Sequence, residues 1–192
     1  MAEQRTANTT PRQDGHRGRQ RGGRRDDRRN RRDDAPKEFE EVVINIDRVA
    51  RVVKGGRRFR FKALVVVGNR KNKVGVGVAK DQDVQTAISK ATDVAKKNLV
   101  VIPLANDTIP HDAEVKVSGA QVLIKPAAPG TGIIAGGVVR QIIGVTGIRN
   151  MLSKSLGSTN KVNIAYATVD ALKTLVPREQ WLNTSTTKKG AK

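Results

Sequence analysis

The sequence predicts an α+β protein built from two domains, and three observations support this prediction. Residues 42–78 are rich in strand-forming residues, and one amphipathic helical segment follows them. A second series of strands and helices begins near residue 111, after Pro103. Hydrophobic residues make up 37% of the 192 residues, so the chain has enough apolar material to bury a core.

The first predicted element is a strand over residues 42–53, and a tight hairpin follows it. The segment KGGR at residues 54–57 supplies the glycines that a short hairpin turn needs for positive φ. In the returning segment RFRFKA, residues 58–63, basic residues alternate with apolar ones. Successive strand residues point to opposite sides, so this alternation predicts one basic face and one core face. The basic face consists of Arg58, Arg60 and Lys62, and the core face consists of Phe59, Phe61 and Ala63.

A third strand is predicted after a turn. Residues 64–67 continue the second strand, residues 68–72 form the turn, and residues 73–78 form the third strand. Valines alternate with glycines in this third strand. A row of glycines on a strand indicates that another backbone, of protein or of nucleic acid, approaches closely.

A helix completes a β-β-β-α unit that ends near Pro103. Apolar residues recur at helical spacing over residues 84–99, and Asp81 or Asp83 can cap the helix. In the second half we expect an α/β domain of about 65 residues, which is small but within the usual range for a domain. Its expected elements are strands at His111–Val117 and Ala120–Lys125, a loop at 126–137, a helix at Val138–Val145, a possible strand at Ile148–Ser153 and a helix at Asn163–Val176.

The charge of the chain points to a polyanionic partner. The chain has 37 Lys and Arg against 18 Asp and Glu, with a net charge of +19, and nucleic acid is the commonest partner of such proteins. Aromatic residues are only 3% of the sequence, which disfavours base stacking as the main binding mode. The absence of cysteine, of a membrane-spanning apolar run and of a signal peptide predicts a soluble, intracellular protein.

The first 34 residues hold 11 Arg and 6 acidic residues but almost no apolar ones. Such a segment cannot offset its chain entropy by burial, so we expect an arm that is disordered in isolation. It would either condense on RNA or remain a solvated extension. Residues 35–192 hold 26 basic and 12 acidic residues, so the folded part is basic in its own right.

The clearest candidate for RNA contact lies between Arg48 and Lys80, where eleven residues are basic and none is acidic. Such a density of one charge repels itself unless an anion neutralises it. The predicted RNA-binding residues are Arg48, Arg51, Lys54, Gly55, Gly56, Arg57, Arg58, Arg60, Lys62, Arg70, Lys71, Lys73, Lys80 and, in the second half, Lys125.

The loop at residues 126–137 contains GTGIIA, which matches the G-x-G-x-x-A pattern of dinucleotide-binding turns. Two prolines precede its first glycine, and no acidic residue lies between Glu114 and Asp170 to hold a ribose, so a nucleotide cofactor is disfavoured. We expect a loop whose backbone contacts RNA phosphate or a neighbouring protein. Its predicted contact residues are Gly130, Gly132, Gly136, Gly137 and Arg140.

Catalytic chemistry finds no support in the sequence. His16 lies in the arm, and His111 stands beside Asp112 at the start of a strand, where a structural or surface role is expected. No cluster has metal-ligand spacing, and no phosphate-binding or nucleophile motif occurs. We therefore expect no enzymatic activity, no metal and no cofactor.

Four phrases, taken together, resemble one family. They are DRVARVVKGGRRFRFKALVVVG at 47–68, VGVGVAK at 74–80, PAAPGTGIIAGGVVRQIIGVTGI at 126–148 and NMLSKSLGSTNKVNIAYATVDAL at 150–172. From about Glu40 to Val176, the chain resembles bacterial small-subunit ribosomal protein five in the order and spacing of these phrases.

This resemblance implies an N-terminal domain like a double-stranded-RNA-binding domain without its first helix. It also implies a small C-terminal α/β domain whose βαβ crossover is left-handed, against the usual rule. The expected organisation is an Arg-rich arm at 1–37, the RNA-binding-like domain at 38–104, the α/β domain at 105–177 and a basic tail at 178–192.

The resemblance also implies a function. Proteins of this family are structural components of the cytoplasmic small ribosomal subunit, bind its ribosomal RNA and influence its assembly and decoding accuracy. They touch small-subunit proteins four and eight and lie where messenger RNA enters, and their Gly-Gly hairpin loop lies near the spectinomycin site. Two alternatives remain open: a free-standing module that binds double-stranded RNA, and an RNA-modifying or nucleotide-using enzyme built on the second domain.

Overall fold

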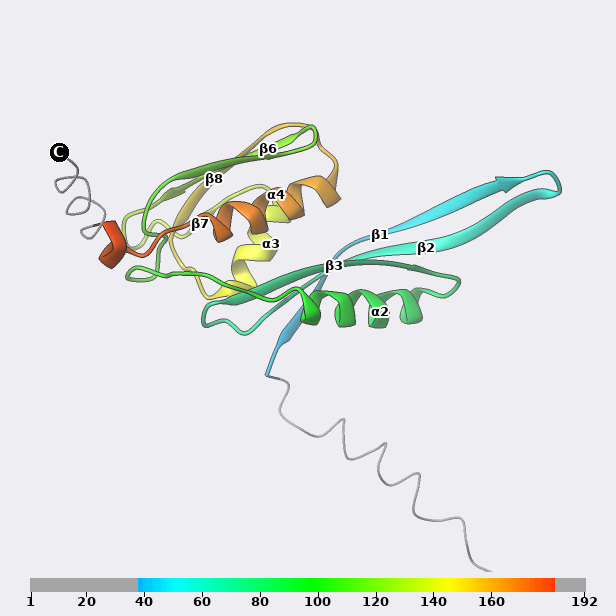
Figure 1. Cartoon of the computed structure of the whole chain (residues 1–192), viewed down its shortest axis with the longest axis horizontal. Helices are drawn as coiled ribbons and strands as arrows, with labels where there is room; N and C mark the ends of the chain where they lie inside the picture. Colours follow the sequence, from blue (N-terminus) through cyan, green and yellow to red (C-terminus); the bar gives the residue numbers. More distant parts are fainter. Residues whose placement is uncertain (1–37, 182–192) are drawn as a thin grey trace, which may run out of the picture. The chain divides into compact units, whose positions relative to one another are not determined.

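A computed structural model describes residues 38–181, which form two four-stranded sheets with helices packed against them (Figure 1). The strand order is β1-β2-β3-β4 in the first sheet and β5-β6-β8-β7 in the second. This arrangement confirms the predicted α+β class. The predicted arm at residues 1–37 and the end of the predicted tail, residues 182–192, lie outside the described residues.

The first sheet is antiparallel throughout and carries one long helix. Its elements are β1 (Glu40–Val53), β2 (Gly56–Gly68), β3 (Lys73–Asp81), α2 (Val84–Lys97) and β4 (Val100–Val101). The predicted strands and helix are therefore present in the predicted order. The short strand β4 escaped prediction because two residues give no periodicity to read.

The two faces of this sheet are buried against different partners. Ala63, Val65 and Val67 pack with three buried alanines of α2. The residues between them, Leu64 and Val66, join a larger core together with residues of the second sheet and its helices. Because successive side chains of β2 point to opposite sides, the apolar residues 63–67 are divided between two clusters.

The glycine row of β3 lies against the backbone of α2. A Cβ atom added at Gly77 would lie 2.6 Å from the backbone nitrogen of Ala95 and closer still to the carbonyl oxygen of Ala91. A Cβ atom at Gly75 would lie 3.1 Å from the carbonyl oxygen of Asn98. The sequence predicted that a backbone of either protein or nucleic acid would approach these glycines. The approaching backbone is that of the protein's own helix α2, and the glycines permit this close packing.

The second sheet combines antiparallel and parallel pairing. Its elements are β5 (Ala113–Val117), β6 (Ala120–Pro126), β7 (Ile133–Ile134), α3 (Gly137–Thr146), β8 (Met151–Gly157) and α4 (Lys161–Lys173). Strand β7 is parallel to β8, and α3 connects them, so the expected βαβ unit is present. The left hand of its crossover stays a prediction from the family resemblance.

Several element bounds in the second half differ from prediction, among them the start of β5, which lies at Ala113 instead of His111. The predicted loop at 126–137 contains β7, and the last strand runs over 151–157 instead of 148–153. The last strand begins later than predicted because Gly147, with a left-handed φ of 92°, caps the end of α3, and Ile148 is then buried in the core. Helix α4 spans 161–173 instead of 163–176, and the side chain of Asn160 caps it by accepting a hydrogen bond from the backbone N–H of Val162.

The turn after β2 packs directly on the end of α3. The backbone N–H of Arg70 donates to the carbonyl of Val145 over 2.9 Å. A Cβ atom at Gly68 would lie 2.8 Å from the carbonyl carbon of Val145, so this contact requires glycine. The C-terminal residues return to the second sheet, where the ring of Trp181 lies 5.5 Å from that of His111. His111 also accepts a hydrogen bond from the backbone N–H of Val176, which gives this histidine a structural role.

Candidate nucleic-acid interface

The β1–β2 hairpin reaches beyond the rest of its sheet (Figure 1). Strand β3 pairs with β2 only from Phe61 onward, whereas β1 pairs with β2 back to Gly56. The segment of β2 from Gly56 to Arg60 thus has a partner strand on one side only. Neither buried core cluster includes a residue of this segment, so both of its faces are available for contact.

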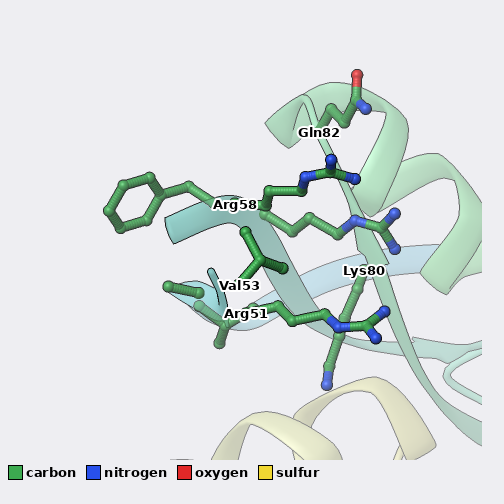
Figure 2. Close-up of a pocket in the computed structure, with 9 residues that line it drawn as sticks. Arg51, Val53, Arg58, Lys80 and Gln82 are labelled. Carbon is green, nitrogen blue, oxygen red and sulfur yellow. The ribbon is translucent and has the colours of Figure 1, made fainter. Parts of the chain in front are cut away.

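The hairpin and the end of β3 form a hollow of about 790 Å³. Three arginines and one lysine line it, together with Phe59, aliphatic side chains and Gln82. Figure 2 shows the labelled side chains of Arg51 and Arg58 extending in the same direction from neighbouring strands. We call this surface the basic hollow, and its cations are Arg51, Arg58, Arg60 and Lys80.

The cations of the basic hollow are not neutralised within residues 38–181. Arg51 is directly opposite Arg58 in the strand pairing, which is unfavourable for two like charges. No acidic residue lines the hollow, and none of the ion pairs formed among the described residues involves its four cations. An anion bound here would remove a repulsion that the free protein carries.

Lys62, also predicted to bind RNA, is paired with an acid inside the protein. Its ammonium lies 2.7 Å from the carboxylate of Asp47, which also accepts a hydrogen bond from Asn45. These contacts, the one from Lys62 first, lower the pKa of Asp47. Asn45 accepts a further hydrogen bond from Lys161 at the start of α4, so the network links the base of the hairpin to the second half of the chain.

Arg70 is likewise paired. Its guanidinium makes a two-pronged contact with the carboxylate of Glu40, with one N–H donating over 2.7 Å. This hydrogen bond lowers the pKa of Glu40 and raises that of Arg70. Arg70 therefore carries less free positive charge toward a partner than the cations of the basic hollow do.

The remaining predicted residues of the first half fall into two groups. The hairpin turn, Lys54 to Arg57, is exposed, and Gly56 has a φ of 131° that side-chain-bearing residues rarely adopt. Arg48 lies on the hairpin, with its guanidinium 3.9 Å from the ring centre of Phe59. Lys71 and Lys73 follow the opposite end of β2, roughly 40 Å from the turn if a 13-residue strand rises about 3.4 Å per residue. The structure thus does not bring these two lysines to the basic hollow.

The alternation prediction needs one correction. Arg58, Arg60 and Lys62 do share a face, but Phe59 on the other face is 46% exposed. The strand continues past the helix that covers Phe61 and Ala63, so no core exists for Phe59 to enter. The pattern of the sequence assigns a side chain to a face, but it cannot show where the covering layer ends.

The loop at residues 126–137, which we call the glycine loop, is shaped by a buried side chain that sequence reasoning missed. The side-chain oxygen of Asn150 accepts hydrogen bonds from the backbone N–H groups of Gly130, over 3.1 Å, and Gly132, over 3.0 Å. Both glycines have positive φ, which fits this tight geometry. Because these two amides are already satisfied, they cannot also cradle a phosphate. The sequence offered one weak signal for a special role of Asn150. It lies within the predicted strand at 148–153, and asparagine is disfavoured in strands.

The other residues predicted at this loop are accessible. Gly136 and Gly137, where α3 begins, are exposed. Arg140 lines a second hollow of about 830 Å³ together with Gly132, Arg70 and Arg149. Lys125 lies apart from both hollows, on β6, where it is paired with Leu152 of β8.

The described part of the chain offers no metal centre. Within residues 38–181, no group of three or more His, Cys, Asp or Glu side chains could hold a metal ion. No helix of these residues is long and apolar enough to cross a membrane.

Comparison with known proteins gives matches along most of the chain. The family model described as ribosomal protein S5, N-terminal domain, matches residues 39–103, and the model of the C-terminal domain matches residues 115–183. Small ribosomal subunit protein uS5 of Campylobacter jejuni is 55% identical over 136 residues, which cover 71% of this chain and 92% of the relative. The protein of the same name from Thermotoga maritima is 50% identical over 144 residues, which cover 74% of this chain and 81% of the relative.

Proposed function

Because this chain belongs to the ribosomal protein S5 family, we propose that it is a structural constituent of the small ribosomal subunit and binds small-subunit ribosomal RNA through the basic hollow. The relatives named above are small ribosomal subunit proteins. Their relation to this chain supports a place in the cytoplasmic small subunit and a role that is not enzymatic.

The observation that carries the RNA-binding proposal is the unneutralised charge of the basic hollow. Three arginines of the β1–β2 hairpin and Lys80 of β3 line one hollow, and Arg51 and Arg58 oppose each other directly. Phosphates that enter the hollow displace their counterions, which favours binding at low salt. Strand pairing sets the spacing of these cations, which restricts the phosphates that they can reach together and so positions the protein on a folded RNA.

The second half of the chain supports the proposal of protein contacts. We assign the exposed glycines at the start of α3, together with Arg140, to a contact with small-subunit protein four or with RNA. Asn150 accepts hydrogen bonds from the backbone N–H groups of Gly130 and Gly132, and these bonds fix the shape of the loop that leads to this surface. We further propose that the protein contacts small-subunit protein eight and lies where messenger RNA enters. It would also contribute to subunit assembly and decoding accuracy.

A competition experiment tests this function. Purified full-length protein is bound to labelled small-subunit ribosomal RNA, and unlabelled small-subunit RNA or a generic RNA duplex is added as competitor. The proposal predicts that the ribosomal RNA competes at a much lower concentration than the duplex. Equal competition by both RNAs would favour the alternative of a free-standing module that binds double-stranded RNA.

A further inference from the structure

Phe59 is an exposed aromatic residue that alternates with Arg58 and Arg60 along β2 and also borders the basic hollow. Strand pairing places Phe59 opposite Ala50 and places Arg57 opposite Val52, and alternation puts all four on one face. Phe59 is 46% exposed and Val52 is 74% exposed. We call this surface the Phe59 face, and it consists of Arg48, Ala50, Val52, Arg57 and Phe59.

Phe59 has no role in the interior of the protein. The next aromatic residue on the same face, Phe61, packs against the cluster under α2, whereas Phe59 belongs to neither core cluster. The guanidinium of Arg48 stacks over its ring at 3.9 Å from the centre, in cation–π geometry. This contact covers one side of the ring and restricts its orientation, while nearly half of the side chain stays accessible.

The charges around the Phe59 face favour an RNA partner over a protein with an acidic or apolar surface. Arg48 and Arg57 flank the ring, and no acidic residue occurs in the sequence from Arg48 to Lys80. The carboxylate of Asp81 lies further along this face, across from Phe61, but it is already paired with Lys90. An aromatic ring between cations matches the chemistry of a nucleotide, which presents a flat base and a phosphate together.

We propose that Phe59 forms a stacking platform for one unpaired nucleobase of the RNA whose phosphates occupy the basic hollow. The hairpin would then hold phosphates at the cations of the basic hollow and one base at Phe59, which borders it. The low aromatic content of the chain disfavours stacking as the main binding mode, but one platform needs only one ring. This inference rests on the proposed function, because it requires that RNA reach the hairpin.

Stacking and phosphate contacts can be separated by their salt dependence. Removing a phosphate contact reduces the slope of log affinity against log salt, whereas removing a stacked base lowers affinity and leaves the slope unchanged. Replacing an aromatic platform residue is expected to weaken binding about 5- to 150-fold. Because Phe59 joins no core cluster, Phe59→Leu should leave the thermal unfolding midpoint close to that of the unaltered protein.

The test compares full-length Phe59→Leu and Phe59→Trp with a matched control, using small-subunit ribosomal RNA at several salt concentrations. The control is Trp181→Leu, which removes an aromatic residue of similar exposure, 41%, far along the sequence. We expect Phe59→Leu to weaken binding within the stated range at an unchanged slope. We expect Phe59→Trp and Trp181→Leu to bind as the unaltered protein does.

A spectroscopic measurement gives an independent readout. In the double variant Phe59→Trp with Trp181→Phe, the only tryptophan lies at the proposed platform, since the chain has one Trp. Stacking of a base on this ring should quench its fluorescence when RNA is added. Unchanged fluorescence, or Phe59→Leu binding as tightly as Trp181→Leu, would overturn the stacking platform.

The experiment also distinguishes failure of this inference from failure of the proposed function. The double variant Arg58→Gln with Arg60→Gln serves as the reference for phosphate contact. If this double variant binds RNA more weakly and with a smaller slope of log affinity against log salt, while Phe59→Leu shows neither change, only the stacking platform is wrong. If it binds like the unaltered protein, the basic hollow is not the binding surface, and the proposed function falls as well.

Discussion

Neutralising two cations of the basic hollow should flatten the salt dependence of RNA binding by a calculable amount. The hollow holds four cations without an acidic partner among the described residues. Each phosphate contact contributes about 0.7 to 0.9 to the slope of log affinity against log salt, so four contacts contribute about 2.8 to 3.6. Removing two, with Arg58→Gln and Arg60→Gln, should lower the slope by about 1.4 to 1.8.

The same arithmetic gives an affinity change that a filter-binding or fluorescence titration can resolve. Over a fourfold rise in salt, four contacts weaken binding about 50- to 150-fold, and the remaining two weaken it only about 7- to 12-fold. RNA contacts outside the basic hollow multiply the affinity loss of the unaltered protein and that of the double variant by the same factor. The variant should also fold at least as well as the unaltered protein, because Arg58→Gln relieves the repulsion between opposed arginines.

A matched control excludes a general effect of net charge. The variant Lys90→Gln with Lys173→Gln also removes two positive charges, but both lysines lie on helices and are paired with acids, Asp81 and Asp170. We expect its slope to stay close to that of the unaltered protein. An equal fall in slope for both double variants would refute the assignment of phosphate contacts to the basic hollow.

Three further predictions concern the fold that supports this surface. Gly77→Ala should lower the free energy of unfolding in urea by about 1–3 kcal/mol or more through overpacking against α2, while Gly55→Ala, with nothing within 4 Å, should change it far less. Contacts that lower the pKa of Asp47 stabilise the fold above the ordinary carboxyl pKa, and this stability is lost as the pH falls through the folded pKa. Unfolding curves of the unaltered protein and Asp47→Asn should therefore differ at neutral pH and converge in acid, and a constant gap would contradict the pairing with Lys62. Asn150→Ala should lower the free energy of unfolding by about 1–3 kcal/mol, because it leaves the loop amides of Gly130 and Gly132 unpaired. Asn150→Asp should lower it less, because an acceptor oxygen remains. Equal losses of stability in the two variants would argue against these hydrogen bonds.

Local alternation and glycine placement were sufficient to predict much of the first sheet. The pattern at residues 58–63 placed Arg58 and Arg60 together, and strand pairing then added Arg51 and Lys80 to the same hollow. Both added residues were among the predicted contacts. What the sequence could not show is which cations are paired, because the acids that neutralise Lys62 and Arg70 lie far from them along the chain.

The second half was harder to predict, for a physical reason. Strand β7 is two residues long and takes its stability from pairing with β8, so no local pattern marks it. Ile148 has the side chain of a strand former, but it is buried beyond the end of α3. Long-range contacts of this kind, including the hydrogen bonds of Asn150 to the glycine loop, leave no periodic trace in the sequence.

We propose that this protein is a stable component of the small ribosomal subunit and that RNA contacts hold it there. The most direct measurement separates a native lysate on sucrose gradients before and after a salt wash and quantifies this protein against small-subunit RNA. We expect one copy per small subunit and release only as salt rises, with release at lower salt for the double variant at Arg58 and Arg60. Recovery of the unaltered protein in the soluble fractions at low salt, or equally with both subunits, would contradict it.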